Sequence, residues 1–590
     1  MTAPFSQPTP GPAETAPGHT TEGAAEASAP PDLPEPIDLS IVAAVAKGKA
    51  PASALGIDPS RIARGAARLD DAIRAEVPIY GVTTGFGPLA DRPIPAERRP
   101  ALQEKLIAHL ASGTGRPYPW RIARTIAAVR LRTIVAGYSG ARAATTSTLA
   151  RLLDSQLAPW IPQQGTVGAS GDLTPLAHLA LALMGRGAFL LPPRPLGTVD
   201  GALAGADLDT FSAPGPAHWP GSRHDAPLAD AATVAACLGG TALHLHARDG
   251  LALVNGTAAM TGVAVDSQGR VERLLRWATL LSVGLAEVLR GRAEAWHQTL
   301  AAIRPHPGQR TITAALAALT AGSARLDHGF LARRAASGPD RAATPSAQES
   351  ESPRTCPQDA YTIRCVPQVL GAVADTVSFH REVVGREVNA VTDNPIFPPP
   401  DSADGALALH GGNFMGLHVA LASDALSAAV LSLAGLAERQ IARLTDERLN
   451  NGLPPFLTRG HVGLDSGLMG AQVSATALLA EMRTRAVPAS AMSISTNGAN
   501  QDVVSMGTIA ARRASQHLDD AARILAILAI AVTEAVAIRS AENATRPFAR
   551  ATDALCRAVR RTVPPILADR PLGAEIEMLA MRLAEEEAPA

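Results

Sequence analysis

Lysine is scarce in this chain of 590 residues. Of its 53 basic residues, only Lys47, Lys49 and Lys105 are lysines, and the first two lie close to a Pro- and Ala-rich head. Catalysis through a Schiff-base lysine, including pyridoxal phosphate chemistry, therefore has few candidates. This scarcity argues against one large class of amino-acid enzymes.

The chain also has few aromatic residues, a small net charge and no recognisable cysteine motif. Aromatic residues make up 3% of the chain and the net charge is −1, so neither base-stacking platforms nor a general attraction to nucleic acid is expected. The four cysteines form no CxxC pair and no zinc-ligand spacing, which is typical of thiols in a reducing compartment. We interpret the two histidines of HLH at 244–246 as structural and expect no bound metal.

Long hydrophobic runs are missing too, although apolar residues at helical spacing are abundant. The most apolar run, at 524–532, is shorter than the roughly 20 residues that cross a bilayer. We therefore expect a soluble, cytoplasmic protein without membrane or nucleic-acid partners. Helix-like runs at 271–296, 425–449 and 516–542, with alternating strand patterns scarce, predict a mainly α fold with a long-helix bundle core and short, local strands.

The length exceeds what one compact core usually spans, and composition suggests four parts. Residues 1–37 are rich in Pro, Ala, Thr and Ser, have no secretory signal and are expected to be disordered. The other parts are a smaller mixed N-terminal segment at 38–235, a central long-helix bundle at 236–520 and a helical tail at 521–590.

The tripeptide Ala-Ser-Gly occurs at 111–113, 169–171 and 336–338. Where rigid surroundings hold such a segment bent, the glycine amide nitrogen can attack the carbonyl two residues earlier. Loss of two waters then gives an imidazolone ring whose exocyclic methylene is a strong electrophile. The copy at 336–338 lies in a polar, proline-bearing stretch that would not hold it bent, and Gly113 of the first copy is expected to cap a helix C-terminus.

The copy at 169–171 stands in a different context. It follows Gly165 and Gly168 and precedes DLTPLAHLALALMG, an apolar helix for which Asp172 is the expected N-cap. Taken alone, the segment could equally be an ordinary tight turn feeding a capped helix.

The segment GTVGASGDLTPLAHLAL resembles the cofactor-forming region of the aromatic amino acid ammonia-lyases, the family of histidine, phenylalanine and tyrosine ammonia-lyases and related aminomutases. Their electrophile is 4-methylideneimidazol-5-one (MIO), formed autocatalytically from an internal Ala-Ser-Gly. Six further segments resemble the family: YGVTTGFG at 80–87, LALVNGTAAMTG at 251–262, QDAYTIRCVPQVLG at 358–371, NAVTDNP at 389–395, HGGNFMG at 410–416 and NGANQDVVSMG at 497–507.

The resemblance covers about residues 38–590 and is strongest to the bacterial tyrosine lyases. It implies the histidine/phenylalanine ammonia-lyase type of fold, MIO made from Ala169, Ser170 and Gly171, and a homotetramer whose active sites are shared between subunits. It also implies elimination of ammonia from L-tyrosine to give trans-p-coumarate, with weaker activity on L-phenylalanine.

Such an elimination needs a base for the β-hydrogen, and Tyr80 is the candidate. A tyrosine with its ordinary pKa of about 10 works as a base at neutral pH only if nearby positive charge or helix N-termini lower that pKa. The alternative is a buried tyrosine with a satisfied hydroxyl.

Tyr361 and Arg364 are three residues apart and would share one face of a helix. The resemblance implies that Arg364 binds the substrate carboxylate, for which its planar fork is suited, and that Tyr361 and Asn255 orient or polarise the MIO carbonyl. The alternative for Arg364 is a surface salt bridge. Further positions match the family's pocket, although the polar ones could equally be turn or cap residues: Gln358, Asn394, Phe414, Asn497 and Gln501.

His109 and Leu110 occupy the place where family members differ, and the bacterial tyrosine lyases resemble this chain in having His-Leu there. An imidazole can hydrogen-bond a para-hydroxyl while leucine packs the ring, and a site that pairs a hydroxyl discriminates against the analogue without one. The alternative is a core histidine with a backbone partner.

Three uncertainties follow from the sequence. Asp465, in GLDSG, stands where relatives commonly carry asparagine, which leaves local pocket detail open. A tyrosine 2,3-aminomutase would use nearly the same residues as a lyase. A catalytically silent helical scaffold would never form the ring.

Overall fold

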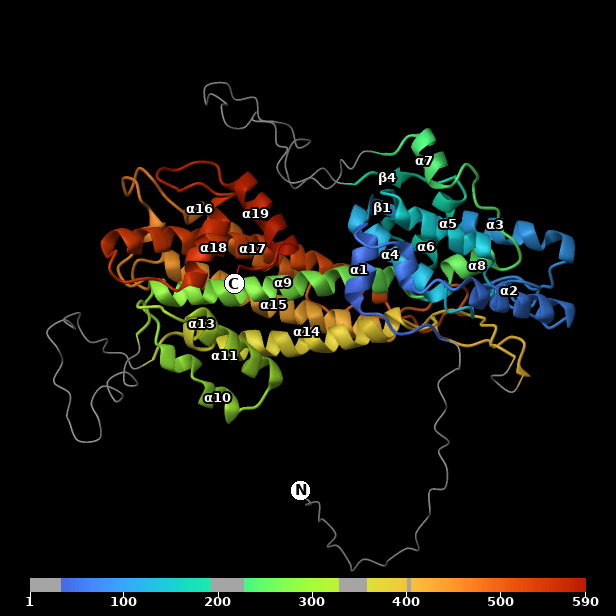
Figure 1. Ribbon diagram of the computed structural model, residues 1–590, viewed down its shortest axis with the longest axis horizontal. Coiled ribbons are helices and arrows are strands. Elements are labelled where there is room, and N and C mark those ends of the chain that lie inside the picture. Colours follow the sequence, from blue (N-terminus) through green and yellow to red (C-terminus); the bar gives the residue numbers. More distant parts are fainter. Residues whose placement is uncertain (1–32, 193–227, 328–357, 401–404, 590) are drawn as a thin grey trace, which may run out of the picture.

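The structure is a computed structural model that describes residues 33–192, 228–327, 358–400 and 405–589. The described part of the chain is elongated, with the N-terminal lobe (residues 33–192 and 228–254) at one end and a bundle of long helices running away from it (Figure 1). The predicted mainly α fold is confirmed, and the described strands form two antiparallel pairs, β1 with β3 and β2 with β4.

The N-terminal lobe consists of short helices and these local strands. Its elements are α1 (Leu39–Ala46), η1 (Ala52–Leu55), α2 (Pro59–Arg74), η2 (Gly87–Leu89), η3 (Ala96–Arg98), α3 (Arg99–Leu110), β1 (Thr114–Pro117), α4 (Trp120–Ile134), α5 (Ala143–Asp154), β2 (Ala158–Pro159), β3 (Pro162–Gln164), α6 (Leu173–Leu183), β4 (Phe189–Leu190), α7 (Ala231–Cys237) and α8 (Asp249–Val254).

Four long helices form the bundle. They are α9 (Ala258–Val288), α14 (Val366–Val388), α15 (Leu417–Thr445) and α17 (Gly507–Glu542). Smaller elements surround their far end: η6 (Ala293–Trp296), α10 (Gln298–Ala302), α11 (Pro307–Leu319), α13 (Tyr361–Arg364), η8 (Pro455–Leu457), α16 (Met469–Thr484), α18 (Arg550–Arg560) and α19 (Gly573–Glu585).

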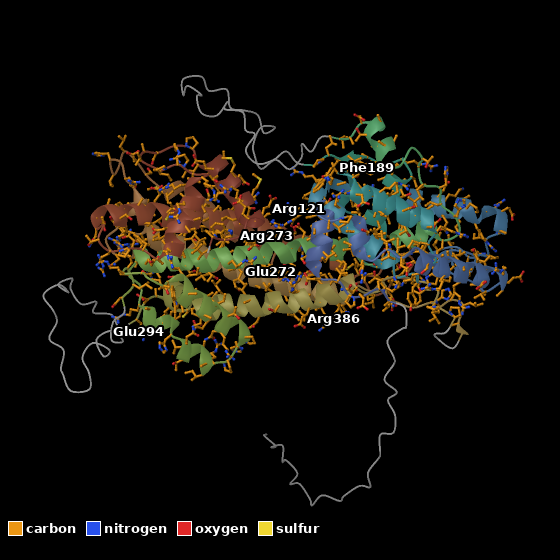
Figure 2. The ribbon with its side chains drawn as sticks, viewed as in Figure 1. Arg121, Phe189, Glu272, Arg273, Glu294 and Arg386 are labelled. Carbon is orange, nitrogen blue, oxygen red and sulfur yellow. The ribbon has the colours of Figure 1, made fainter. Side chains whose placement is uncertain are left out.

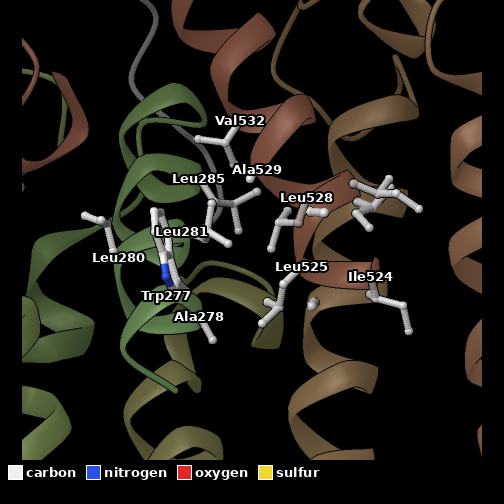
Figure 3. Close-up of a cluster of buried hydrophobic side chains, with 14 of the residues drawn as sticks. Trp277, Ala278, Leu280, Leu281, Leu285, Ile524, Leu525, Leu528, Ala529 and Val532 are labelled. Carbon is white, nitrogen blue, oxygen red and sulfur yellow. The ribbon is translucent and has the colours of Figure 1, made fainter. Parts of the chain in front are cut away.

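The bundle core lies where α9 faces α17. Trp277, Leu281 and Leu285 of α9 meet Leu525 and Leu528 of α17, and each of these side chains is 3% exposed or less (Figure 3). Burying one such side chain contributes about 1.5–3 kcal/mol, so this seam stabilises the association of the two helices. The middle of the predicted 516–542 helix is buried all round, from Ile524 to Val536.

By length and composition alone, α15 and α17 could cross a membrane. In the structure they pack against each other and against α9, and 61% and 83% of their most apolar stretches are buried within the chain. We identify them as core helices of a soluble bundle, which agrees with the expectation from the sequence.

Ion pairs join the lobe to the bundle. Arg121 of α4 donates to Asp266 of α9 at 2.6 Å, and both side chains are largely buried. Figure 2 places Arg121 at this junction, close to Glu272 and Arg273 on the next turns of α9. Because a partly buried pair has fewer alternative partners in water, it fixes the orientation of the lobe better than a surface pair would.

The ordered fold begins inside the segment predicted as a disordered head, 1–37. Arg132 donates to the carbonyl oxygen of Glu35 at 2.7 Å, and Ile37 exchanges two hydrogen bonds of 2.9 and 3.0 Å with the side-chain amide of Asn389. These contacts correct the boundary, which composition alone could not place. Residues 1–32 lie outside the described residues.

Two helices run across the predicted inner boundaries. The boundary between 235 and 236 falls within α7, and the boundary between 520 and 521 falls within α17, which is one continuous helix. Periodic apolar residues continue through both points, so a change in composition there does not end a helix.

Candidate active site

The segment Ala169-Ser170-Gly171 lies between β3 and α6 and is held against the segment that precedes α9. Gly171 has φ +68°, and an added Cβ would lie 2.1 Å from the carbonyl oxygen of Gly256. Gly168 has φ +70° and would place a Cβ 2.4 Å from the Ser505 hydroxyl. Only glycine permits these close approaches, so the loop is confined from both sides.

Asp172 follows this loop and corrects one prediction. It occupies the N-cap position of α6, but its carboxylate makes no capping bond there. Instead it accepts from the backbone N–H of Met260, in the first turn of α9, at 2.7 Å and from the hydroxyl of Thr508 in α17. Burial raises the pKa of Asp172 to about 6. The carboxylate therefore ties the loop to two long helices.

Three long helices begin beside the loop. The segment before α9 pairs with Gly171, the backbone N–H of Met506 just before α17 donates to Val167 at 2.9 Å, and Gly416 before α15 touches Met260 of α9. Helix N-termini carry about half a positive charge each. Their convergence makes this end of the bundle favourable for an anionic group.

One polar side chain contacts the loop directly, and a second is buried next to Gly256. The side-chain amide of Gln501 donates to the Ser170 hydroxyl at 2.9 Å. Asn255 is 2% exposed, its backbone carbonyl accepts from Arg130 at 2.6 Å, and its side-chain oxygen is buried without a hydrogen-bond partner. A buried polar atom left unpaired is unfavourable unless another group meets it.

Tyr80 lies in a turn of the N-terminal lobe, and its aromatic ring makes an edge contact with Phe86. Its hydroxyl accepts from the backbone N–H of Gly87 at 2.9 Å. Burial raises the pKa of the Tyr80 phenol, and the Gly87 hydrogen bond lowers it by less. Within one chain, the lowering of this pKa that a base needs is therefore not present.

His109 and Leu110 close the last turn of α3, which packs on α6 and α8. His109 is exposed, and its Nδ1 lies 3.1 Å from the carbonyl oxygen of Lys105. A ring that donates there keeps Nε2 as an acceptor. The histidine thus has a backbone partner, as its alternative interpretation supposed, but it is not part of the core.

Other predicted positions surround the same end of the bundle. Asn497 has φ +55° and its side-chain amide borders Gly87, next to the Tyr80 hydroxyl. Asn394 accepts from the backbone N–H of Gly411 at 2.7 Å, so it works at least partly as a turn residue. Phe414 is half-buried in the turn before α15.

Tyr361, Arg364 and Gln358 lie elsewhere. Tyr361 and Arg364 share a face of α13 as predicted, with the guanidinium 4.6 Å from the centre of the ring. This short helix is anchored just past the C-terminal end of α9, where Trp296 of η6 donates to the carbonyl of Ile363 at 3.0 Å. Asn255 precedes the other end of α9, whose 31 residues span roughly 45 Å.

One chain therefore does not bring the two halves of the predicted site together. Tyr361 is 69% exposed, and Gln358 is exposed beside it. In Figure 1, α13 lies under the far half of the bundle, whereas α6 and α8 lie in the N-terminal lobe. The predicted site residues thus form two separate groups, at opposite ends of α9.

The other two Ala-Ser-Gly copies differ from the one at 169–171. Gly113 is not a helix C-cap: α3 is capped by Ala111, and Gly113 donates its N–H to His178 at 3.2 Å. The strand β1 starts at the next residue, which keeps this backbone extended. The copy at 336–338 lies outside the described residues.

Asp465 lies in a surface loop at the C-terminal end of the bundle. Its two carboxylate oxygens accept from the backbone N–H groups of His461 at 2.9 Å and Asp569 at 3.0 Å. The negative charge organises this loop. His244 and His246 are exposed and lie outside any helix, and no group of three potential metal ligands occurs in the part of the chain that the structure describes.

The sequence did not reveal a buried charged cluster behind the site, formed by Arg130, Arg248 and Asp393. Both arginines donate to Asp393, at 3.2 and 2.7 Å, and all three side chains are fully buried. Arg130 also holds Asn255, and Asp393 accepts from the backbone N–H of Asn394 at 2.8 Å. In the sequence, Asp393 stands inside the NAVTDNP segment. The two arginines that pair with it lie over a hundred residues away, so the sequence does not reveal the cluster.

Comparison with known proteins gives the family. Residues 37–561 match the family model described as aromatic amino acid lyase, so the chain belongs to this family and is an enzyme of the carbon–nitrogen lyase class. The resemblance and the fold expected from the sequence are confirmed.

Two relatives and one solved structure show which members of the family this chain is similar to. A tyrosine ammonia-lyase of Cereibacter sphaeroides is 49% identical over 559 residues, which is 94% of this chain and 97% of the relative. A MIO-dependent tyrosine 2,3-aminomutase of Streptomyces globisporus is 37% identical over 516 residues, covering 87% and 86% of the two chains. The crystal structure of the tyrosine aminomutase from that organism matches with a TM-score of 0.77 and 34% identity, covering 93% of this chain and 95% of that one.

Proposed function

We propose that this protein is a tyrosine ammonia-lyase, which eliminates ammonia from L-tyrosine to give trans-p-coumarate and acts more weakly on L-phenylalanine. The observation that carries the proposal is the clamp on Ser170 and Gly171, which are pressed against Gly256 and contacted by Gln501. The 49% identity to a tyrosine ammonia-lyase supports the substrate.

The residues around this clamp fit MIO made from Ala169, Ser170 and Gly171. Gly171 has no room for a side chain, as a buried, strained turn requires, and Asn255 offers a buried oxygen that has no partner within the chain. Once formed, MIO supplies an electrophilic carbon to bind the substrate amine. No metal or pyridoxal phosphate is part of the proposal.

The remaining work belongs to side chains of this protein. Tyr80, in its phenolate form, takes the β-hydrogen of the substrate through its oxygen and becomes a neutral phenol. Before that step, the Gly87 N–H helps to hold the phenolate. His109, through Nε2, accepts from the para-hydroxyl, while Leu110 packs on the ring. Arg364 binds the carboxylate with its planar fork, and Tyr361 and Asn255 orient the reacting group. The other pocket positions, including Phe414, line the site.

Because Tyr361, Arg364 and Gln358 lie at the opposite end of α9, a helix roughly 45 Å long, we propose a cytoplasmic homotetramer whose sites combine residues of several subunits. Apolar side chains on α16 and on the segments around it are suited to such contacts, since monomers rarely expose so many. Those more than half exposed include Leu464, Val473, Val487, Met492, Ile494 and Val503. Arg364 from another subunit would also lower the pKa of Tyr80.

The test combines two measurements on purified protein. Incubation with L-tyrosine should release coumarate and ammonia in equal amounts, and the intact mass should be two waters below that of the unmodified sequence. If the intact mass equals that of the unmodified sequence, no ring has formed and the protein is a catalytically silent scaffold. Loss of the waters without coumarate would refute the lyase.

A second candidate function is supported by the aminomutase relatives. A tyrosine 2,3-aminomutase would return ammonia to the β-carbon. Product analysis separates the two, because β-tyrosine appears only in that case.

A further inference from the structure

His410 has no part in the proposed chemistry, yet it contacts the residue that does. The backbone N–H of Tyr80 donates to Nε2 of His410 at 3.2 Å, across 330 residues of sequence. The loop's other bonds span fewer residues. The carbonyl of Ile79 accepts from Val82 and Thr83, at 3.1 and 3.0 Å, and the side chain of Gln103 in α3 donates to the carbonyl of Gly81 at 2.8 Å. His410 is therefore a long-range attachment of the Tyr80 backbone.

The direction of this hydrogen bond defines the state of the imidazole. A backbone N–H can only donate, so Nε2 must carry the lone pair and the ring proton must be on Nδ1. An imidazolium has no acceptor and would lose the bond. The pKa of His410 is lowered, first by partial burial and then by the charge of Arg248, which favours the neutral ring.

His410 itself is fixed from both sides. Leu409 exchanges two backbone hydrogen bonds with Ile396, at 2.9 and 3.0 Å, and the N–H of Gly411 donates to the Asn394 side chain at 2.7 Å. An exposed histidine on a free loop would move with its backbone and sample several rotamers. Here hydrogen bonds hold the backbone on both sides of His410, which limits the positions that its imidazole can reach.

These attachments lead back to the buried charged cluster. Asp393 accepts from Asn394, Arg130 and Arg248, and Arg130 in turn holds the carbonyl of Asn255. The charged groups that face His410 from this side are Arg248 and, behind it, Asp393. One rigid cluster thus fixes both Asn255 and the segment that carries His410.

We propose that His410 is a positioning residue, which holds the Tyr80 loop in register with the Ser170 loop by accepting the Tyr80 backbone N–H. The role of Tyr80 in turnover rests on the proposed function, but the attachment does not. Because misplacement of a reacting group by about 1 Å can cost 100-fold in rate, the attachment should affect kcat more than KM.

The test uses two substitutions in the full-length enzyme. His410→Leu removes the acceptor at similar volume, whereas His410→Gln keeps an oxygen near the position of Nε2. Amide hydrogen exchange of a fragment containing Tyr80 is measured first, because it requires no turnover. We expect exchange to be about three- to tenfold faster in His410→Leu and close to wild type in His410→Gln, as one net hydrogen bond predicts.

Turnover and pH provide further readouts that a purely structural role would not move. We expect kcat with L-tyrosine to fall about 10–100-fold in His410→Leu with little change in KM, and to be largely restored in His410→Gln. After correction for intrinsic exchange, wild-type protection of Tyr80 should weaken as pH falls below the ordinary histidine value of 6.5, because protonation favours the open loop. His410→Gln should lack this dependence.

A matched control is available at the other end of the bundle. His297 is also exposed and accepts a backbone N–H, that of Thr299, through Nδ1 at 3.3 Å. His297→Leu should loosen that turn without changing kcat. Wild-type exchange at Tyr80 in His410→Leu would overturn the proposal, whereas altered exchange in a protein that does not deaminate tyrosine would overturn only the proposed function.

Discussion

Gly171→Ala tests the confinement of the Ser170 loop directly. The new Cβ would lie 2.1 Å from the carbonyl oxygen of Gly256 and 2.3 Å from its carbonyl carbon, so the two backbones must separate by roughly 1 Å. Alanine at φ +68° adds about 1 kcal/mol, and overpacking typically adds about 1–3 kcal/mol. Together these two costs disfavour, by about 2–4 kcal/mol, the bent conformation that the chain needs for ring closure.

The expected result is a folded protein that does not lose two waters. Intact mass after denaturation measures this without any substrate. Gly240→Ala is the matched control, because Gly240 has φ +78° but no atom within 4 Å of an added Cβ. It carries the conformational cost alone and should still lose two waters. If Gly171→Ala lost them too, close contact with Gly256 could not be what enforces ring formation.

Three further predictions concern activity and stability. Tyr80→Phe should fold normally but lose nearly all turnover; wild-type activity would remove Tyr80 from the role of base. His109→Phe should shift preference from tyrosine toward phenylalanine, and an unchanged ratio of their kcat/KM values would contradict the assignment. Burial lowers the pKa of His380 to about 4, so its contribution to stability is complete above pH 6.5 and is lost as pH falls toward 4. In urea unfolding between these pH values, His380→Asn, which keeps a donor for Gln268, should remove up to about 3 kcal/mol of the pH dependence.

Much of the fold could be predicted because helical periodicity depends on local sequence. The run at 516–542 is helical throughout and the run at 425–449 is helical as far as Thr445, although α15 and α17 begin eight or nine residues earlier. Their first turns are less regular in pattern and are stabilised by tertiary contacts, such as the one between Gly416 and Met260. Boundaries that depend on such contacts are not encoded in periodicity.

The site could be predicted only as far as residue types and resemblance allow. Asp172 was expected to cap α6, but it accepts from Met260, since α9 passes its side chain in space. The segment HGGNFMG indicates no role for His410, because its partner lies 330 residues away. That Tyr361 lies on the far side of α9 was likewise invisible, since sequence order says nothing about which end of a helix a segment joins.

Because α9 is long, ring formation and turnover would depend on groups at different ends of this helix. Under the proposed function, the groups that would form the ring lie near Ser170 within a single polypeptide, whereas turnover would need Arg364 from a second copy. Mixing a subunit that lacks the Tyr80 hydroxyl with one that lacks the Arg364 guanidinium would therefore give hybrid oligomers in which some sites carry neither defect. Dissociating the proposed oligomer would stop deamination, but each polypeptide would stay lighter by two waters. The covalent modification would therefore persist after activity is lost.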